Sequence, residues 1–121
     1  MLLARTLSDE GGESHFDEVE IPFSETDFIA GAQPIGVSEP WIASQVSMLS
    51  VPPGWSDSQH PTPVRQIVVI LSGGAEITTS DGEIRVFEKG DAVLLADLEG
   101  KGHGTRFASD EATLIVSIRL A

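Results

Sequence analysis

The chain has 121 residues, 40% of them hydrophobic, which is enough for one domain with a core but excludes a two-domain dinucleotide-binding enzyme and a barrel of eight βα units. Nineteen acidic residues against seven basic ones give a net charge of −12, so we expect no binding to nucleic acid or to an anionic membrane surface. The absence of cysteine excludes disulfides, thiolate metal sites and a cysteine nucleophile.

Residues 1–40 form an acidic N-terminal segment, in which Arg5 is the only basic residue. The loose alternation of polar and apolar residues over 16–21 predicts an edge strand, and we assign this segment to the same domain as the rest of the chain. The apolar run at residues 1–3 is too short for a signal peptide, and no window approaches the ~18 apolar residues of a membrane span. We therefore expect a cytoplasmic protein without a membrane segment.

Residues 41–121 are divided by turn signals into short segments. Runs rich in β-branched residues predict strands at 64–71, 92–96 and 112–118. Asp81-Gly82, between predicted strands at 75–79 and 83–87, is the strongest hairpin signal. Glycine and proline mark the other turns, at Pro52-Pro53-Gly54, Ser72-Gly73-Gly74, Lys89-Gly90-Asp91 and Gly100-Lys101-Gly102. About seven short strands and no amphipathic helix predict an all-β sandwich or barrel.

The predicted strand at 64–71 is apolar on both faces. If Gln66 points into the fold, Val68 and Ile70 point the same way, and the alternate residues point outward. An apolar outer face needs a cover, which implies a second sheet or a partner subunit. We therefore predict a homodimer, in which the acidic N-terminal segment packs across the partner.

The chain has three histidines, His15, His60 and His103. His15 lies in an acidic stretch and is most simply an exposed surface residue. His60 and His103 each follow a turn and precede a predicted strand, so they could converge at the mouth of a barrel. Their spacing alone favours two unrelated histidines. Asp57, Ser58 and His60 do not make a convincing triad, because no strand-to-helix turn presents the serine.

Two spacings around these histidines resemble the two sequence motifs of the cupin superfamily. The first motif is matched by Gly54, His60, Thr62, Gln66 and Gly73. The second is matched more loosely by Gly90, Gly100, His103 and Phe107, without the usual Pro and with Phe107 in place of Asn. The resemblance covers Gly54 to Arg119 and implies a double-stranded β-helix, or jelly roll, which is also the all-β class that the strands predict.

The resemblance also implies a site. In metal-bearing cupins the two histidines and the glutamate of the first motif bind a divalent metal together with the histidine of the second. Here Thr62 replaces a histidine and Gln66 replaces the glutamate, so the available ligands are weaker than an imidazole and a carboxylate. The implied metal, Fe, Mn, Ni or Zn at His60, Gln66 and His103, is then weakly bound or absent.

Several side chains are predicted to share one small-molecule pocket. Besides the two histidines, they are Thr62, Gln66, Thr105, Trp55 and Phe107, the last two forming an apolar mouth. As an enzyme, the chain would use His60 or His103 as a general base, since histidine titrates near neutrality, for proton transfer, isomerisation, lyase or, with iron, dioxygenase chemistry. The alternatives are a non-catalytic small-ligand-binding module and a fold in which the histidines only satisfy buried polar groups. The sequence leaves open whether the chain is an enzyme, and it names no substrate.

Overall fold

The computed structural model describes residues 1–121, which form eleven β-strands and no helix, as the sequence predicts. The strands are β1 (Leu2–Ser8), β2 (Ser14–Glu20), β3 (Ser24–Thr26), β4 (Ile35–Val37), β5 (Ala43–Val51), β6 (Gln66–Ser72), β7 (Gly74–Thr79), β8 (Ile84–Glu88), β9 (Ala92–Leu95), β10 (His103–Arg106) and β11 (Thr113–Leu120). Consequently no helix is available that could cross a membrane.

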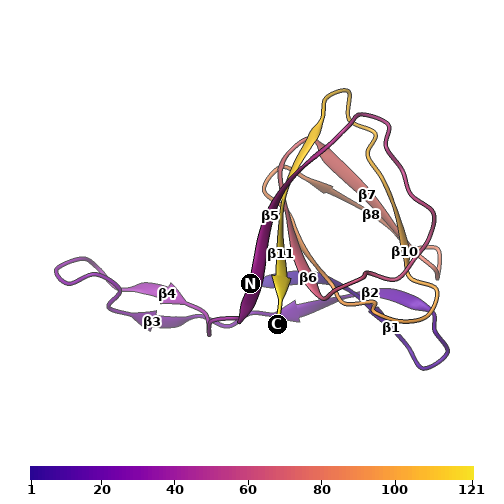
Figure 1. Ribbon diagram of the computed structural model, residues 1–121. Coiled ribbons are helices and arrows are strands. Elements are labelled where there is room, and N and C mark those ends of the chain that lie inside the picture. The colour runs from indigo at the N-terminus through magenta and orange to yellow at the C-terminus, as the bar shows by residue number, and fades with distance from the viewer.

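Two sheets face each other, and a third projects from them (Figure 1). The first has six strands in the order β2-β1-β9-β6-β11-β5, and the second has three in the order β10-β7-β8. Only β1 and β9 pair in parallel. No strand pair joins the two sheets, so the molecule is an open sandwich rather than a closed barrel.

The main core lies between the two sheets because the strands alternate with a period of two. Ile70 of β6 and Val93 of β9 point inward from the six-stranded sheet and are 1% exposed. Ile77 of β7 and Phe87 of β8 meet them from the three-stranded sheet. Burial of such side chains contributes about 1.5–3 kcal/mol each, which holds the sheets together.

The outer face of the six-stranded sheet is also apolar, as the sequence predicts for 64–71. Leu3, Leu94 and Leu120 form a second buried cluster there, with Ile67 and Trp41 packed against it. The second sheet covers the inner face only, and on the outer face the cluster is packed by residues that include Ile21 and Trp41. Toward β5, at the edge of the sheet, the face becomes exposed.

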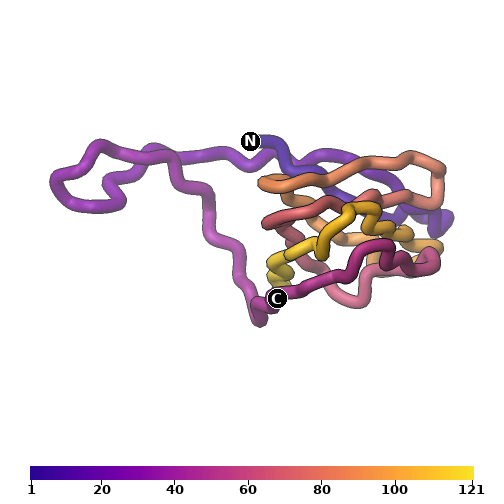
Figure 2. Tube along the Cα trace, turned by 90° about the horizontal axis from the view of Figure 1, so that it is seen from above, coloured from indigo at the N-terminus to yellow at the C-terminus, as the bar shows by residue number.

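Residues 22–40, which we call the arm, leave the sandwich altogether. The arm contains the two-stranded sheet β3-β4, which pairs with no other strand. Figure 2 shows it running away from the rest of the chain. The sequence predicts one acidic segment over residues 1–40, with a strand only at 16–21. The structure places β2 there, at the edge of the six-stranded sheet, and places β1 next to it.

The strand containing Gln66 begins at that residue, so Thr62 and His60 precede it in a loop. These two residues therefore reach the predicted pocket from a loop and not from a strand face. What positions this loop is a close approach at Gly102, which has a φ of +71°. A Cβ at Gly102 would lie 1.9 Å from the carbonyl carbon of His60, so only glycine lets these two backbone segments pair.

Candidate functional site

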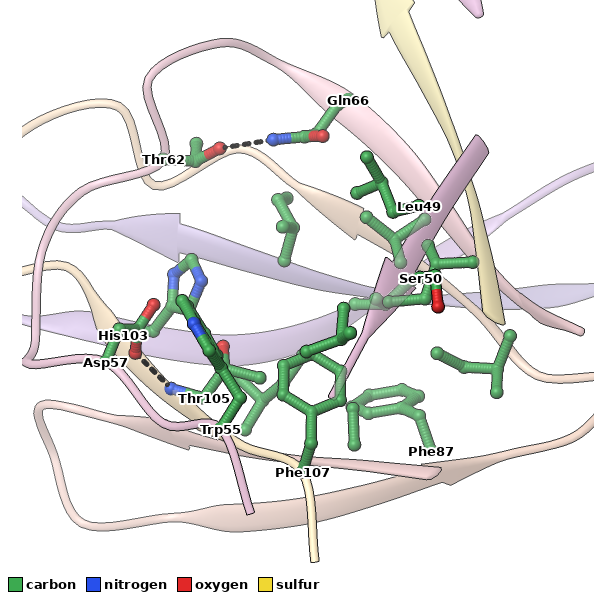
Figure 3. A pocket seen from close by; sticks show the side chains of 18 of the residues that line it. Leu49, Ser50, Trp55, Asp57, Thr62, Gln66, Phe87, His103, Thr105 and Phe107 are labelled. Atoms are coloured by element: carbon green, nitrogen blue, oxygen red, sulfur yellow. Dashed lines mark hydrogen bonds between the residues drawn. The ribbon is translucent and has the colours of Figure 1, made fainter. Parts of the chain in front are cut away.

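A cavity of about 530 Å³ lies between the two sheets. Thirteen of its 22 lining residues are hydrophobic, and most of them lie on the strands of the two sheets, while Trp55 and Phe107 lie outside the strands. Polar side chains gather at one end, where the loop before β6 meets β10 (Figure 3). All seven residues that the sequence predicts for the pocket line this cavity: Trp55, His60, Thr62, Gln66, His103, Thr105 and Phe107.

His60 and His103 are brought together by their backbones. The N–H of each donates to the carbonyl oxygen of the other at 3.0 Å, and their ring centroids are 5.8 Å apart. Trp55 and Phe107 meet edge to face beside them, with centroids 5.7 Å apart. The histidines are thus neighbours although they lie 43 positions apart in the sequence.

His103 is held from one side by a buried carboxylate. Its Nδ1 donates to Oδ2 of Asp97 at 2.6 Å, and the other oxygen of Asp97 accepts from the Thr6 hydroxyl at 2.7 Å. Asp97 is 0% exposed. The second ring nitrogen, Nε2, makes no hydrogen bond. Every fully buried side-chain nitrogen and oxygen has a partner, so Nε2 is not fully buried and opens onto the cavity. Because Nδ1 carries the proton, Nε2 of the neutral ring has a free lone pair.

His60 is in a different state. Its Nδ1 faces the carbonyl oxygen of Pro61 and its Nε2 faces Oδ2 of Asp57, both at 2.8 Å. Both partners are acceptors, so both bonds are formed together only when the ring is an imidazolium and both nitrogens donate. The bonds to Pro61 and then Asp57 raise the pKa of His60 above its usual value. Asp57 is fixed in turn, because its Oδ1 accepts from the N–H of Thr105 at 2.7 Å (Figure 3).

Gln66 is engaged at both ends of its amide. Its nitrogen donates to the Thr62 hydroxyl at 3.1 Å, and its oxygen accepts from the Ser117 hydroxyl at 2.6 Å. Thr62 donates to the carbonyl of Val64 at 2.7 Å. These bonds fix the amide in the cavity wall.

The donor set does not fit the metal that the resemblance implies. His60 has no free lone pair, and the Gln66 oxygen already accepts a hydrogen bond. Only Nε2 of His103 is unengaged. No group of three or more histidine and carboxylate side chains is arranged to hold a metal ion. A divalent metal needs about three protein ligands at such a site, so we derive no chemistry through one.

Asp57 and Asp97 are the two site residues that the sequence analysis does not select. Asp57 appears there only in the rejected triad. Asp97 follows an apolar strand directly and precedes His103 by six residues. A carboxylate at the end of a buried strand, close in sequence to a candidate histidine, is the signal that could have found it.

Comparisons with known proteins agree with this fold. The model of the cupin domain family matches residues 47–119. A cupin 2 conserved barrel domain protein from Salinispora arenicola is 29% identical, with a TM-score of 0.52 over 69% of this chain and 71% of that one. An uncharacterized conserved protein with a double-stranded β-helix domain from Klebsiella pneumoniae is 25% identical, with a TM-score of 0.50 over 62% of this chain and 64% of that one. The sequence matches no curated protein.

One further similarity extends over nearly the whole chain. An RmlC-like cupin from Shewanella frigidimarina is 16% identical, with a TM-score of 0.51 over 98% of this chain and 85% of that one. At this identity the similarity supports the fold alone. The family match covers more than half of the chain and includes the cavity between the sheets. With its all-β sandwich and the matched motifs around His60 and His103, the chain belongs to the cupin family and has the double-stranded β-helix fold.

Proposed function

We propose that this cupin binds a small, mainly apolar molecule in its cavity and uses His103 as a general base on it. The observation that carries the proposal is the free Nε2 of His103 in the cavity wall, with Nδ1 bonded to the buried Asp97. A carboxylate in this position fixes the tautomer and stabilises the imidazolium that forms when the ring accepts a proton. Since His60 has no free lone pair in its present bonds, the role of base goes to His103.

The lining defines the class of ligand. The cavity volume falls in the range of about 300–1,000 Å³ that is usual for small-molecule sites, and its hydrophobic residues suit a hydrocarbon or aromatic body. At the polar end, the charge of Asp57 is offset by the His60 imidazolium, whereas that of Asp97 is not offset when His103 is neutral. An anionic head group would be repelled there, so a neutral ligand is favoured.

The reaction that suits these groups is removal of a proton from carbon next to a carbonyl, or from a hydroxyl. In the first case the ligand's proton passes to Nε2 of His103, the pair of the broken C–H bond forms a carbon–carbon double bond, and the π pair of the carbonyl moves onto its oxygen. The Gln66 amide nitrogen uses one of its two hydrogens on Thr62, which leaves the other for that oxygen. Such a step is shared by isomerases and lyases, and it needs no redox partner.

Binding is tested with the neutral fluorescent probe N-phenyl-1-naphthylamine. Val68→Phe fills the cavity from β6 and should abolish the fluorescence increase, because Val68 lines it. Val86→Phe adds the same bulk on β8, where Val86 is 59% exposed and outside this cavity, so it should leave binding unchanged. Equal binding by both variants would contradict the assignment of the cavity.

Catalysis is tested by following deuterium uptake from D₂O into neutral apolar ketones by ¹H NMR. Wild-type protein should exchange the protons next to the carbonyl, and His103→Gln should lose this exchange by about 100-fold or more while it still binds the probe. His15→Gln is the matched control, because His15 lies outside the cavity, and it should retain exchange. Binding without exchange in the wild type would overturn the role of base and favour the non-catalytic binding module. Equal exchange in wild type and His103→Gln would overturn the role as well.

A further inference from the structure

Thr62 is a buried residue of the cavity wall, and the proton of its hydroxyl has a fixed destination. The residue is 2% exposed, and its Oγ1 donates to the carbonyl oxygen of Val64 at 2.7 Å. A carbonyl oxygen can only accept, so the proton of this hydroxyl is used on Val64. Toward any other neighbour, the Thr62 oxygen is therefore an acceptor.

The backbone around Thr62 holds the hydroxyl in this position. Thr62 lies between Pro61 and Pro63, whose rings fix φ at about −65°, and a residue before proline is restricted to extended conformations. Its own N–H donates to the carbonyl oxygen of Asp97 at 3.0 Å. The segment that carries the hydroxyl is thus fastened to the same residue that bonds to His103.

The Gln66 amide lies between Thr62 and Ser117. Its Nε2 donates to Thr62 at 3.1 Å (Figure 3), and its Oε1 accepts from the Ser117 hydroxyl at 2.6 Å. The two neighbours do not constrain the amide equally. The Ser117 hydroxyl makes no other hydrogen bond and can either donate to an oxygen or accept from a nitrogen, whereas Thr62 can only accept.

Reversal of the amide is opposed on the Thr62 side alone. A reversed Gln66 would place its oxygen against the Thr62 oxygen, which has no proton left to offer. If Thr62 turned its proton to Gln66 instead, the Val64 carbonyl, which accepts no other hydrogen bond, would lose its donor. The Ser117 hydroxyl would only need to rotate and accept. The direction of the amide is therefore decided by Thr62.

We propose that Thr62 is a positioning residue that fixes the direction of the Gln66 amide and so makes the cavity select a ligand with a hydrogen-bond acceptor, such as a ketone. Both residues line the cavity, and the second N–H of Gln66 has no partner within the chain. A carbonyl oxygen can accept from this N–H, whereas a hydrocarbon of the same shape would leave it unsatisfied. The class of ligand rests on the proposed function, and the direction of the amide does not.

The direction of the amide is measured in the ligand-free protein by ¹⁵N-edited NOE spectroscopy. The side-chain N–H protons of Gln66 should give stronger NOEs to Thr62 than to Ser117. Thr62→Val, which keeps the shape and removes the acceptor, should reverse these intensities, and Thr62→Ser should retain the wild-type pattern. Ser117→Ala is the matched control, because it removes the bond at the other end of the amide and should leave the NOEs to Thr62 in place. Stronger NOEs to Ser117 in the wild type, or an unchanged pattern in Thr62→Val, would overturn the proposal.

Selection of the ligand is measured by competition with N-phenyl-1-naphthylamine. Acetophenone and isopropenylbenzene differ only in a C=O against a C=CH₂ group, so the ratio of their dissociation constants isolates the hydrogen bond. Thr62→Val should shift this ratio against the ketone by about fivefold, as expected for the loss of one net hydrogen bond. Thr62→Ser and Ser117→Ala should leave the ratio close to the wild-type value. The same ratio in wild type and Thr62→Val would overturn the role of Thr62.

Failure of the proposed function can be told apart from failure of this role. Absence of proton exchange in the wild type would contradict His103 as the base, and the NOEs and the ratio would still support Thr62 as the positioning residue. An unchanged ratio in Thr62→Val would remove that role, while the cavity and the base would stand. If neither compound displaced the probe from the wild type, both the class of ligand and its selection by Thr62 would be wrong.

Discussion

His60 and His103 lie side by side across a backbone bridge, yet each is bonded to a carboxylate of its own. Their ring centroids are 5.8 Å apart, while Asp57 bonds His60 and Asp97 bonds His103. The bond of His60 to Pro61 adds a second acceptor, so its ring donates twice, whereas His103 donates once and keeps a lone pair. The two histidines are therefore held differently and are not a pair of equivalent ligands.

Asp97→Asn should separate the stability of the site from its chemistry. An asparagine can still bond to Thr6 and His103, but its amide would donate to Nδ1, which moves the ring proton to Nε2 and removes the lone pair from the cavity. We expect a small loss of unfolding free energy, about 1 kcal/mol, together with loss of the proton exchange. The tautomer is measured by ¹⁵N NMR of the imidazole and the stability by urea denaturation.

Asp97→Ala is the companion variant. It leaves the Thr6 hydroxyl and the His103 Nδ1 with no acceptor for their protons in a buried place, although the Thr6 oxygen still accepts from the N–H of Ala96. The loss should cost about 3 kcal/mol of unfolding free energy, since each unsatisfied group costs about 1–3 kcal/mol. If Asp97→Ala were as stable as wild type in urea, the buried pair would not contribute to the fold as described.

His60 should titrate above its usual pKa in the folded chain. Its bonds to the Pro61 carbonyl and the Asp57 carboxylate both favour the protonated ring. Because the pKa is raised on folding, the stabilisation is fully present below the unfolded value and is lost as the pH rises through the folded value. An NMR titration of the His60 ring should show the raised pKa, and Asp57→Asn should lower it. An unchanged pKa in Asp57→Asn would exclude the carboxylate as a cause.

Much of the fold could be predicted from the sequence because strand alternation and glycine turns are local signals. The predicted strands at 64–71, 92–96 and 112–118 correspond to β6, β9 and β11, and the hairpin at Asp81-Gly82 joins β7 and β8. Gln66 shares the cavity with Val68 and Ile70, as its spacing predicts. Each of these depends on residues close together in the chain.

The protonation states of the site could not be predicted in the same way. That His60 faces two acceptors depends on Asp57 and on a loop folded by the close approach at Gly102, and neither follows from motif spacing. The two strands of the arm could not be predicted because each has three residues, which is too short to show an alternating pattern. Whether the chain is dimeric depends on surfaces that meet only between molecules.

Gly102→Ala should disrupt the site more than an equivalent change elsewhere. A Cβ would fall 1.9 Å from the backbone of His60, so the His60–His103 bridge must open. Gly82→Ala is the matched control, because Gly82 also has a positive φ, 93°, but has nothing within 4 Å of the added atom. We expect a loss of about 1–2 kcal/mol at Gly82, from backbone strain alone, and a clearly larger loss at Gly102. Equal losses in chemical denaturation would show that the close approach is not maintained in solution.

His15 should give the fold a second source of pH dependence. Its Nε2 bonds to Asp9 at 2.7 Å and its Nδ1 to Asp81 at 3.0 Å, so the ring joins the β1–β2 turn to the β7–β8 turn although it is 40% exposed. The bond to Asp9, and then that to Asp81, raise the pKa of His15, while the pKa values of both carboxyls are lowered. The charged groups nearby, Glu13 and Lys101, pair with each other.

The sign of the His15 effect follows from its raised pKa. The stabilisation is present below the unfolded pKa of histidine, about 6.5, and is lost as the pH rises through the folded pKa. The melting temperature of His15→Gln should therefore differ from that of wild type more at pH 5.5 than at pH 8.5. His60→Gln is the matched variant, and combining both changes should reduce the pH dependence further than either change alone. If His15→Gln lowered the melting temperature equally at the two pH values, the ring would act through packing and not through its charge.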